Sequence, residues 1–117
     1  MSGESALSKR IGLALSRLPG LRLFRNQVGR YKLADGRWLA SGLKVGSGDR
    51  IGWRSRLITP DMVGQRIAQF VSIEVKGDDG VEDDDQIEWA QTVRDAGGLA
   101  GFAYSEQDAL DIVDGKT

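Results

Sequence analysis

The sequence of 117 residues predicts an α/β fold in which a central mixed sheet is flanked by helices, in the order α–β–β–β–α–β–α. One observation is the two-residue alternation of apolar and polar side chains over residues 67–76, which is the period of a strand. The other is the three- or four-residue spacing of apolar side chains over 4–18 and 82–96, which is the period of a helix. At this length we expect one domain, covering residues 1–117.

Local signals define the ends of these elements. Pro19-Gly20 ends the first helical pattern, and Gly97-Gly98 stops the second. Asp35-Gly36 is a standard hairpin turn, and Ser105 with Asp108 has capping-box spacing. The expected elements are a helix over 4–18, a strand over 21–28, a hairpin over 29–42, strands over 49–58 and 67–76, a helix over 82–96, a strand over 99–104 and a helix over 105–113.

The composition excludes several kinds of chemistry. The chain has no cysteine and no histidine, which rules out disulfides, thiolate zinc sites, thiol nucleophiles and imidazole bases. Carboxylates, lysine, hydroxyls or an oxygen-bound metal must therefore carry any reaction. No apolar run approaches the length of a transmembrane helix, and the N-terminal segment lacks the order of a secretory signal. We expect no membrane partner and a cytoplasmic location.

Charge is distributed unevenly along the chain. Residues 1–66 hold 13 Lys/Arg and 4 Asp/Glu, a balance of +9, whereas residues 67–117 hold 3 and 13, a balance of −10. The basic half favours a polyanionic partner, and the acidic half favours solvation, metal attraction or contact with another subunit. Mutual attraction of the two halves within the fold is the alternative interpretation.

Two opposite charges lie on the expected strand over 67–76. Glu74 and Lys76 are two positions apart, so their side chains share one face of the strand. Asp49 opens the preceding strand after a glycine-rich loop, and can lie across from Glu74 if the two strands are neighbours. Two carboxylates and a lysine are the parts of a magnesium-dependent phosphodiesterase. An ordinary ion pair on a solvated sheet face is the alternative, and the spacing alone favours it.

The sequence around these residues favours the metal-dependent site over the ordinary ion pair. "GSGDRIGW", followed roughly twenty residues later by "IEVKG", resembles the PD-(D/E)XK nuclease superfamily, with Gly48 in place of the usual proline. Together with "RNQVG" and "DDDQIEWAQTVRDAGGLAGFAYS", these segments resemble the virus-type replication-repair nuclease (VRR-NUC) domain over nearly the whole chain. Gln86 and Trp89 have the family's Q-x-x-W spacing, and Gly97-Gly98 matches its double glycine. Arg50 departs from the family, which usually has an apolar residue there.

The resemblance implies a restriction-endonuclease-like core and a metal site within a single VRR-NUC nuclease domain. Asp49 and Glu74 would be the metal ligands, together with the backbone carbonyl of Val75. Glu4 of the first helix would lie near the metal through water. The expected ion is Mg²⁺, for which Mn²⁺ can substitute. For Glu4, an acidic first-turn residue favoured by the helix dipole is the alternative.

The resemblance also implies two further catalytic residues beside Asp49 and Glu74. Lys76 would be the catalytic lysine, and Gln86 would complete the site from the helix over 82–96. The alternative for Gln86 is a polar residue at a helix N-terminus. We interpret the acidic run 83–85 as the solvated start of that helix, stabilised by the dipole.

Basic residues are candidates for holding the DNA backbone. Arg25 and Asn26 match the family's "RN", and Arg25 could contact a phosphate or organise the site. A surface strand charge is the alternative for Arg25. The other candidates are Lys32, Arg37, Lys44, Arg50, Arg54 and Arg56, of which we favour Lys44, Arg50 and Arg54.

The expected function is thus a Mg²⁺-dependent endodeoxyribonuclease that cleaves branched DNA such as a Holliday junction. The viral members of the family resemble homodimeric junction-cleaving enzymes, so we expect a homodimer with two active sites. The alternatives are a nucleic-acid-binding module with a degenerate site, and a flap-type or restriction-type nuclease.

Overall fold

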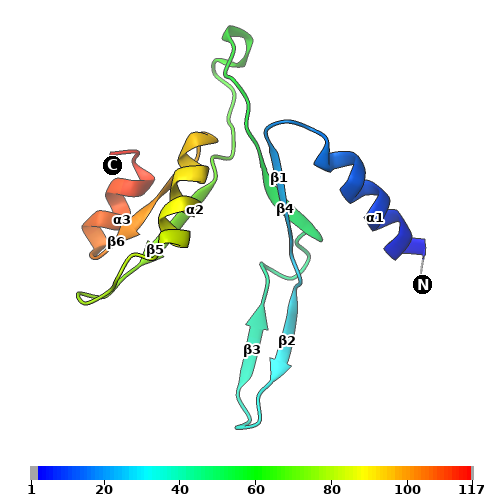
Figure 1. The fold of residues 1–117 in the computed structure, drawn as a ribbon, viewed down its shortest axis with the longest axis horizontal. Helices are drawn as coiled ribbons and strands as arrows, with labels where there is room; N and C mark the ends of the chain where they lie inside the picture. The colour runs from blue at the N-terminus through cyan, green and yellow to red at the C-terminus, as the bar shows by residue number, and fades with distance from the viewer. Residues whose placement is uncertain (1–2, 117) are drawn as a thin grey trace. The chain divides into compact units, whose positions relative to one another are not determined.

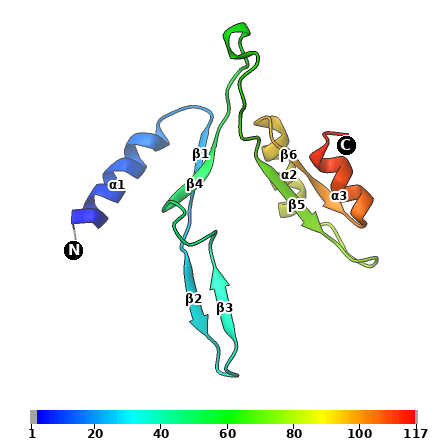
Figure 2. The same ribbon diagram turned by 180° about the vertical axis from the view of Figure 1, so that it is seen from behind.

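The computed structural model describes residues 3–116. The chain divides into two compact units, Met1–Arg54 (unit 1) and Ser55–Thr117 (unit 2), and each is described by itself. Figures 1 and 2 show their helices and strands from opposite sides. The single domain over residues 1–117 stays a prediction.

Unit 1 begins with a helix that packs on one face of a two-stranded sheet. Helix α1 (Gly3–Ser16) precedes strand β1 (Leu21–Arg25), which pairs antiparallel with β4 (Arg50–Arg54). Arg25 and Arg50 form the last rung of this ladder. The Arg50 side chain donates to Ser8 of α1, so the face that carries the two arginines is the one toward the helix.

A hairpin is inserted between β1 and β4. Strands β2 (Gly29–Lys32) and β3 (Trp38–Ser41) pair antiparallel, which confirms the predicted hairpin. The turn contains Gly36 at φ +90°, a conformation that glycine adopts without steric cost. Asp35 stabilises the turn by accepting hydrogen bonds from the backbone and side chain of Arg37, at 3.0 and 2.6 Å.

Unit 2 is a strand–helix–strand unit followed by a helix. After a short 3₁₀ helix, η1 (Pro60–Met62), strand β5 (Val71–Val75) pairs parallel with β6 (Leu99–Ala103). Helix α2 (Asp84–Asp95) connects the two strands, as parallel pairing requires. Helix α3 (Glu106–Val113) follows β6.

The two helices of unit 2 cover opposite faces of the β5–β6 pair. Ser72 and Glu74 share one face and contact α2 through hydrogen bonds. Ile73 and its neighbour Gly101 share the other face, where Ile112 of α3 packs. A Cβ at Gly101 would lie 3.1 Å from the Ile112 side chain, so the missing side chain permits this close approach.

The buried apolar side chains of the described residues all lie in unit 2. They come from α2, β6 and α3, and are Ala90, Val93, Ala100, Ala103 and Ile112. In unit 1 the apolar side chains are half-buried or exposed. The described hydrophobic core therefore lies between the β5–β6 pair and the helices on its two faces.

The predicted helix ends of unit 2 are confirmed. Gly97 has φ +102° directly after α2, and its backbone N–H donates to Arg94 O at 2.9 Å. Ser105 is the N-cap of α3, and its hydroxyl accepts from the backbone N–H of Asp108 at 3.1 Å. The Asp108 carboxylate accepts from the backbone N–H of Tyr104 in return.

The predicted mixed α/β class is confirmed, with three α-helices among residues 3–116. The strands of these residues form three two-stranded sheets. The single central mixed sheet and the restriction-endonuclease-like core stay predictions. None of the helices in the described part of the chain has the length and apolar character needed to cross a membrane.

Candidate active site

The Glu74 carboxylate on β5 is held by an amide from the first turn of α2. Gln86 Nε2 donates to Glu74 Oε1 at 2.8 Å. The oxygen of the same amide accepts from the backbone N–H of Asp83, at 3.2 Å, just before the helix. Because a backbone N–H can only donate, the Gln86 oxygen must face Asp83 and its nitrogen must face Glu74. Gln86 therefore orients the carboxylate.

A second hydrogen bond joins the same helix and strand. Trp89 Nε1 donates to Ser72 Oγ at 2.9 Å, and the Trp89 ring meets Phe70 edge-on at a centroid distance of 6.4 Å. Trp89 lies three residues after Gln86 on α2, and Ser72 lies two residues before Glu74 on β5. The Gln86–Glu74 and Trp89–Ser72 hydrogen bonds therefore join one face of α2 to one face of β5, one helical turn apart on the helix and two residues apart on the strand. Together they hold α2 in place on β5.

Lys76 lies close to the same carboxylate. Its Nζ is 3.9 Å from Glu74 Oε1, and its side chain is only 14% exposed, compared with 45% for Glu74. A turn closed by the Gly80 N–H to Gly77 O bond covers the lysine stem. A Cβ at Gly80 would lie 2.9 Å from Lys76 Cβ, so glycine is required for this coverage.

The ion pair considered from the sequence is therefore present, but helix α2 covers its strand face. Glu74 and Gln86 line a cavity of about 170 Å³ between β5, α2 and β6. Asp85 lines the same cavity. Asp83, Asp84 and Asp85 are exposed in or beside the first turn of α2, as predicted, but the contribution of Asp85 to the cavity was not predicted.

Two carboxylates, Glu74 and Asp85, are among the residues around this cavity. Among the described residues, no group of three or more acidic side chains gathers into a ready metal site. Mg²⁺, however, is usually bound through one or two carboxylates, with water and substrate phosphate completing its shell. Glu74 and Asp85 supply two carboxylates on one cavity, and Val75 ends the strand that carries Glu74.

In unit 1, Asn26 organises the loop that precedes Asp49. Its Nδ2 donates to Ser47 Oγ at 2.7 Å and to Gly48 O at 2.9 Å, and its Oδ1 accepts from Leu43 N at 2.9 Å. Its backbone N–H donates to Asp49 O at 2.8 Å. Both hydrogens and the oxygen of the Asn26 amide thus form hydrogen bonds within the loop. Its predicted contact with DNA stays a prediction.

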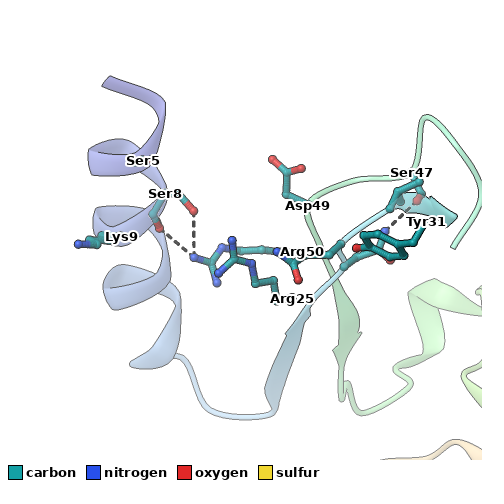
Figure 3. Close-up of a pocket in the computed structure, with 11 residues that line it drawn as sticks. Ser5, Ser8, Lys9, Arg25, Tyr31, Ser47, Asp49 and Arg50 are labelled. Atoms are coloured by element: carbon teal, nitrogen blue, oxygen red, sulfur yellow. Dashed lines mark hydrogen bonds between the residues drawn. The ribbon is translucent and has the colours of Figure 1, made fainter. Parts of the chain in front are cut away.

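Asp49 lines a second cavity, the α1 pocket, which is enclosed by α1, the end of the β1–β4 ladder and the start of β2. It measures about 590 Å³ and also has Arg25, Arg50 and Tyr31 on its walls (Figure 3). Asp49 is exposed, and its carboxylate makes no hydrogen bond or ion pair with the described residues. Lys44 and Arg54, the other predicted DNA contacts, are exposed and lie outside the pocket lining.

The structure thus brings together three of the predicted catalytic residues, Glu74, Lys76 and Gln86, within unit 2. Asp49 belongs to unit 1, so a metal site shared by Asp49 and Glu74 stays a prediction. The backbone of Glu4 belongs to α1, and its side chain lies outside the described part of the structure. No role for Ser72 was predicted from the sequence. Two spacings could have indicated one: Ser72 shares a strand face with Glu74, and Trp89 shares a helix face with Gln86.

Comparisons of the chain with protein-family models, with curated proteins and with solved structures find no match.

Proposed function

We propose that the chain is a metal-dependent DNA endonuclease that hydrolyses phosphodiester bonds in branched DNA. The observation that carries this proposal is the Glu74 carboxylate, with Gln86 Nε2 at 2.8 Å and Lys76 Nζ at 3.9 Å, on a cavity beneath α2. An oriented carboxylate beside a shielded ammonium suits the hydrolysis of a phosphodiester. The resemblance of the sequence around these residues to VRR-NUC domains points to the same function.

Each residue would have a distinct part in the reaction. Glu74 would hold Mg²⁺ together with the Val75 carbonyl and Asp49, and Gln86 would keep the Glu74 carboxylate in one orientation. A bound Mg²⁺ would polarise the phosphate and lower the pKa of water. Lys76 would donate hydrogen bonds to the attacking water or to the charge that develops on the phosphate. Its low exposure strengthens that interaction, because less water screens the ammonium.

The proposal extends to the fold and the assembly. The antiparallel β1–β4 pair and the parallel β5–β6 pair would belong to one mixed sheet, as in a restriction-endonuclease-like core. A homodimer would supply two active sites, which suits paired nicks on a four-way junction. Flap-type and restriction-type nucleases are alternatives within the same chemistry, and a binding module with a degenerate site is the alternative outside it.

The test is cleavage of labelled DNA by the purified chain. Four-way junction, flap, splayed-arm and linear substrates are incubated with Mg²⁺, with Mn²⁺ or with EDTA. We expect metal-dependent nicking of the branched substrates. Lys76→Ala and Glu74→Gln should lower the rate about 100-fold or more, since the first removes the ammonium at the reacting phosphate and the second removes a carboxylate that would hold Mg²⁺.

Lys116→Ala is the matched control for Lys76→Ala, because it removes a lysine from the exposed C-terminal segment of the same unit. It should cleave like the wild type. Equal cleavage by Lys76→Ala and wild type would contradict the role of Lys76. Binding of branched DNA without cleavage under any metal condition would support the degenerate binding module.

A further inference from the structure

The α1 pocket has the size and charge of a nucleotide-binding pocket. Its volume of about 590 Å³ lies within the range of small-ligand sites. Three cations, Lys9, Arg25 and Arg50, line it against one carboxylate, Asp49. Unit 1 as a whole has 11 Lys/Arg and 3 Asp/Glu, a balance of +8. The pocket therefore lies in a positive field that favours phosphate.

The two arginines form a site for an anion. Arg25 and Arg50 are direct partners on the last rung of the β1–β4 ladder, a placement in which like charges repel. Arg50 Nη2 is fixed by Ser8, through its backbone oxygen at 3.0 Å and its hydroxyl at 3.1 Å. Among the described residues the Arg25 side chain has no hydrogen bond or ion pair. A phosphate would pair with Arg25 and relieve the repulsion.

An exposed aromatic ring lies on another wall of the same pocket. Tyr31 of β2 is 51% exposed, and its hydroxyl lies beside Gly29, where a Cβ would be 3.3 Å from Oη. The Tyr31 hydroxyl also lies 3.4 Å from Ser41 Oγ across the hairpin, a long and exposed contact. In Figure 3, Asp49 lies between α1 and Tyr31. An exposed ring at this position offers a stacking surface to a nucleobase.

We propose that the α1 pocket binds an unpaired nucleotide of a DNA strand, with its phosphate on Arg25 and Arg50 and its base against Tyr31. A base inside a duplex is stacked on its neighbours, so only an unpaired one can reach the ring. The use of such binding in DNA cleavage rests on the proposed nuclease function. The inference narrows the substrate to branched DNA with a single-stranded segment, such as a flap or a splayed arm.

The test measures binding alone, in EDTA, so that no cleavage occurs. Fluorescence anisotropy compares a labelled single strand of about 15 nucleotides with a blunt duplex of the same sequence. We expect the single strand to bind about tenfold more tightly or better. Tyr31→Ala should lose about tenfold on the single strand and little on the duplex, and Tyr31→Trp should retain binding. Arg25→Ala should weaken binding and reduce the salt dependence by about one phosphate contact.

Matched controls separate the pocket from the rest of unit 1. Trp38→Ala removes an exposed aromatic from the same hairpin outside the pocket, and Arg17→Ala removes a cation just after α1. Both should bind the single strand nearly as the wild type does. Photocrosslinking of a strand that contains 5-iododeoxyuridine should label Tyr31 in the wild-type chain, which gives a readout independent of any variant's folding.

Several outcomes would overturn the inference. These are equal binding of single strand and duplex, an equal loss in Trp38→Ala and Tyr31→Ala, or crosslinking confined to residues outside the pocket. Tight binding of a free mononucleotide that the single strand does not displace would assign the pocket to a small ligand instead. The experiments distinguish failure of this inference from failure of the proposed nuclease function. Cleavage of a fully paired junction, without preference for a single strand, would contradict only the inference about the pocket. Single-strand binding without any cleavage would contradict only the proposed nuclease function.

Discussion

The two units of the chain differ in charge and in core. Unit 1 carries a balance of +8 and, among its described residues, has no fully buried side chain. Unit 2 holds 5 Lys/Arg and 14 Asp/Glu, a balance of −9, and contains all five buried apolar side chains of the described residues. The basic unit has an open pocket in which the Arg25 side chain has no hydrogen bond or ion pair with the described residues. The acidic unit has a carboxylate, an amide and a lysine in fixed contact.

This difference suggests a division of labour. Catalytic groups must be held within a few tenths of an ångström, and helices and strands packed on a core provide that precision. Groups that attract a polyanion need only charge and access, and an exposed sheet with arginines provides both. Under the proposed function, the reaction would take place in unit 2 and the strand would bind to unit 1.

The largest effect that would test the comparison is loss of core packing. Ile112→Ala removes a side chain that is 1% exposed beneath β6, and should lower the free energy of unfolding by about 2–5 kcal/mol. Leu13→Ala in α1 shortens a side chain that is 64% exposed, and should change it by less than about 0.5 kcal/mol. Urea denaturation measures both. Equal losses would contradict a core confined to unit 2.

A smaller effect is expected where α2 docks on β5. Ser72→Ala and Trp89→Phe each remove the hydrogen bond between Trp89 Nε1 and Ser72 Oγ, and each should cost about 1 kcal/mol of unfolding free energy. The double variant should cost less than the sum of the two, because they share one bond. Cleavage should fall in all three as Gln86 loses its alignment with Glu74. Additive costs with unchanged cleavage would contradict the positioning role.

The smallest effect concerns the pKa of an exposed phenol in unit 2. The hydrogen bond from Tyr104 Oη to Glu82 Oε2, at 2.5 Å, raises the pKa of Tyr104 above its usual value of 10.0. The bond stabilises the neutral phenol, so its contribution is present below about pH 10 and is lost as pH rises through the raised pKa.

Ultraviolet titration of the Tyr31→Phe chain, in which Tyr104 is the sole tyrosine, should show a midpoint above 10. Glu82→Ala should lower that midpoint toward the ordinary value. A midpoint that does not move would show that Glu82 is not the cause.

Helix-capping and turn residues, together with the periodicity of apolar side chains, made much of the fold predictable. The double glycine after α2, the serine before α3 and Asp35-Gly36 in the hairpin act within a few residues, so their effects are readable from the sequence. The predicted strands over 21–28 and 49–58 were too long, because β1 and β4 end where their ladder ends at Arg25 and Arg54. Pairing depends on a partner far along the chain, which local patterns do not contain.

The same contrast holds for the candidate site. Alternation along β5 placed Glu74 and Lys76 on one face, and helical spacing placed Gln86 and Trp89 on another, because both periods follow from backbone geometry alone. Only the tertiary structure decided that these two faces meet, that Ser72 receives the Trp89 hydrogen bond, and that Arg25 and Arg50 form opposite ends of one rung. Register and docking are set by contacts between distant segments, and a single sequence records the residues that make such contacts without recording which of them pair.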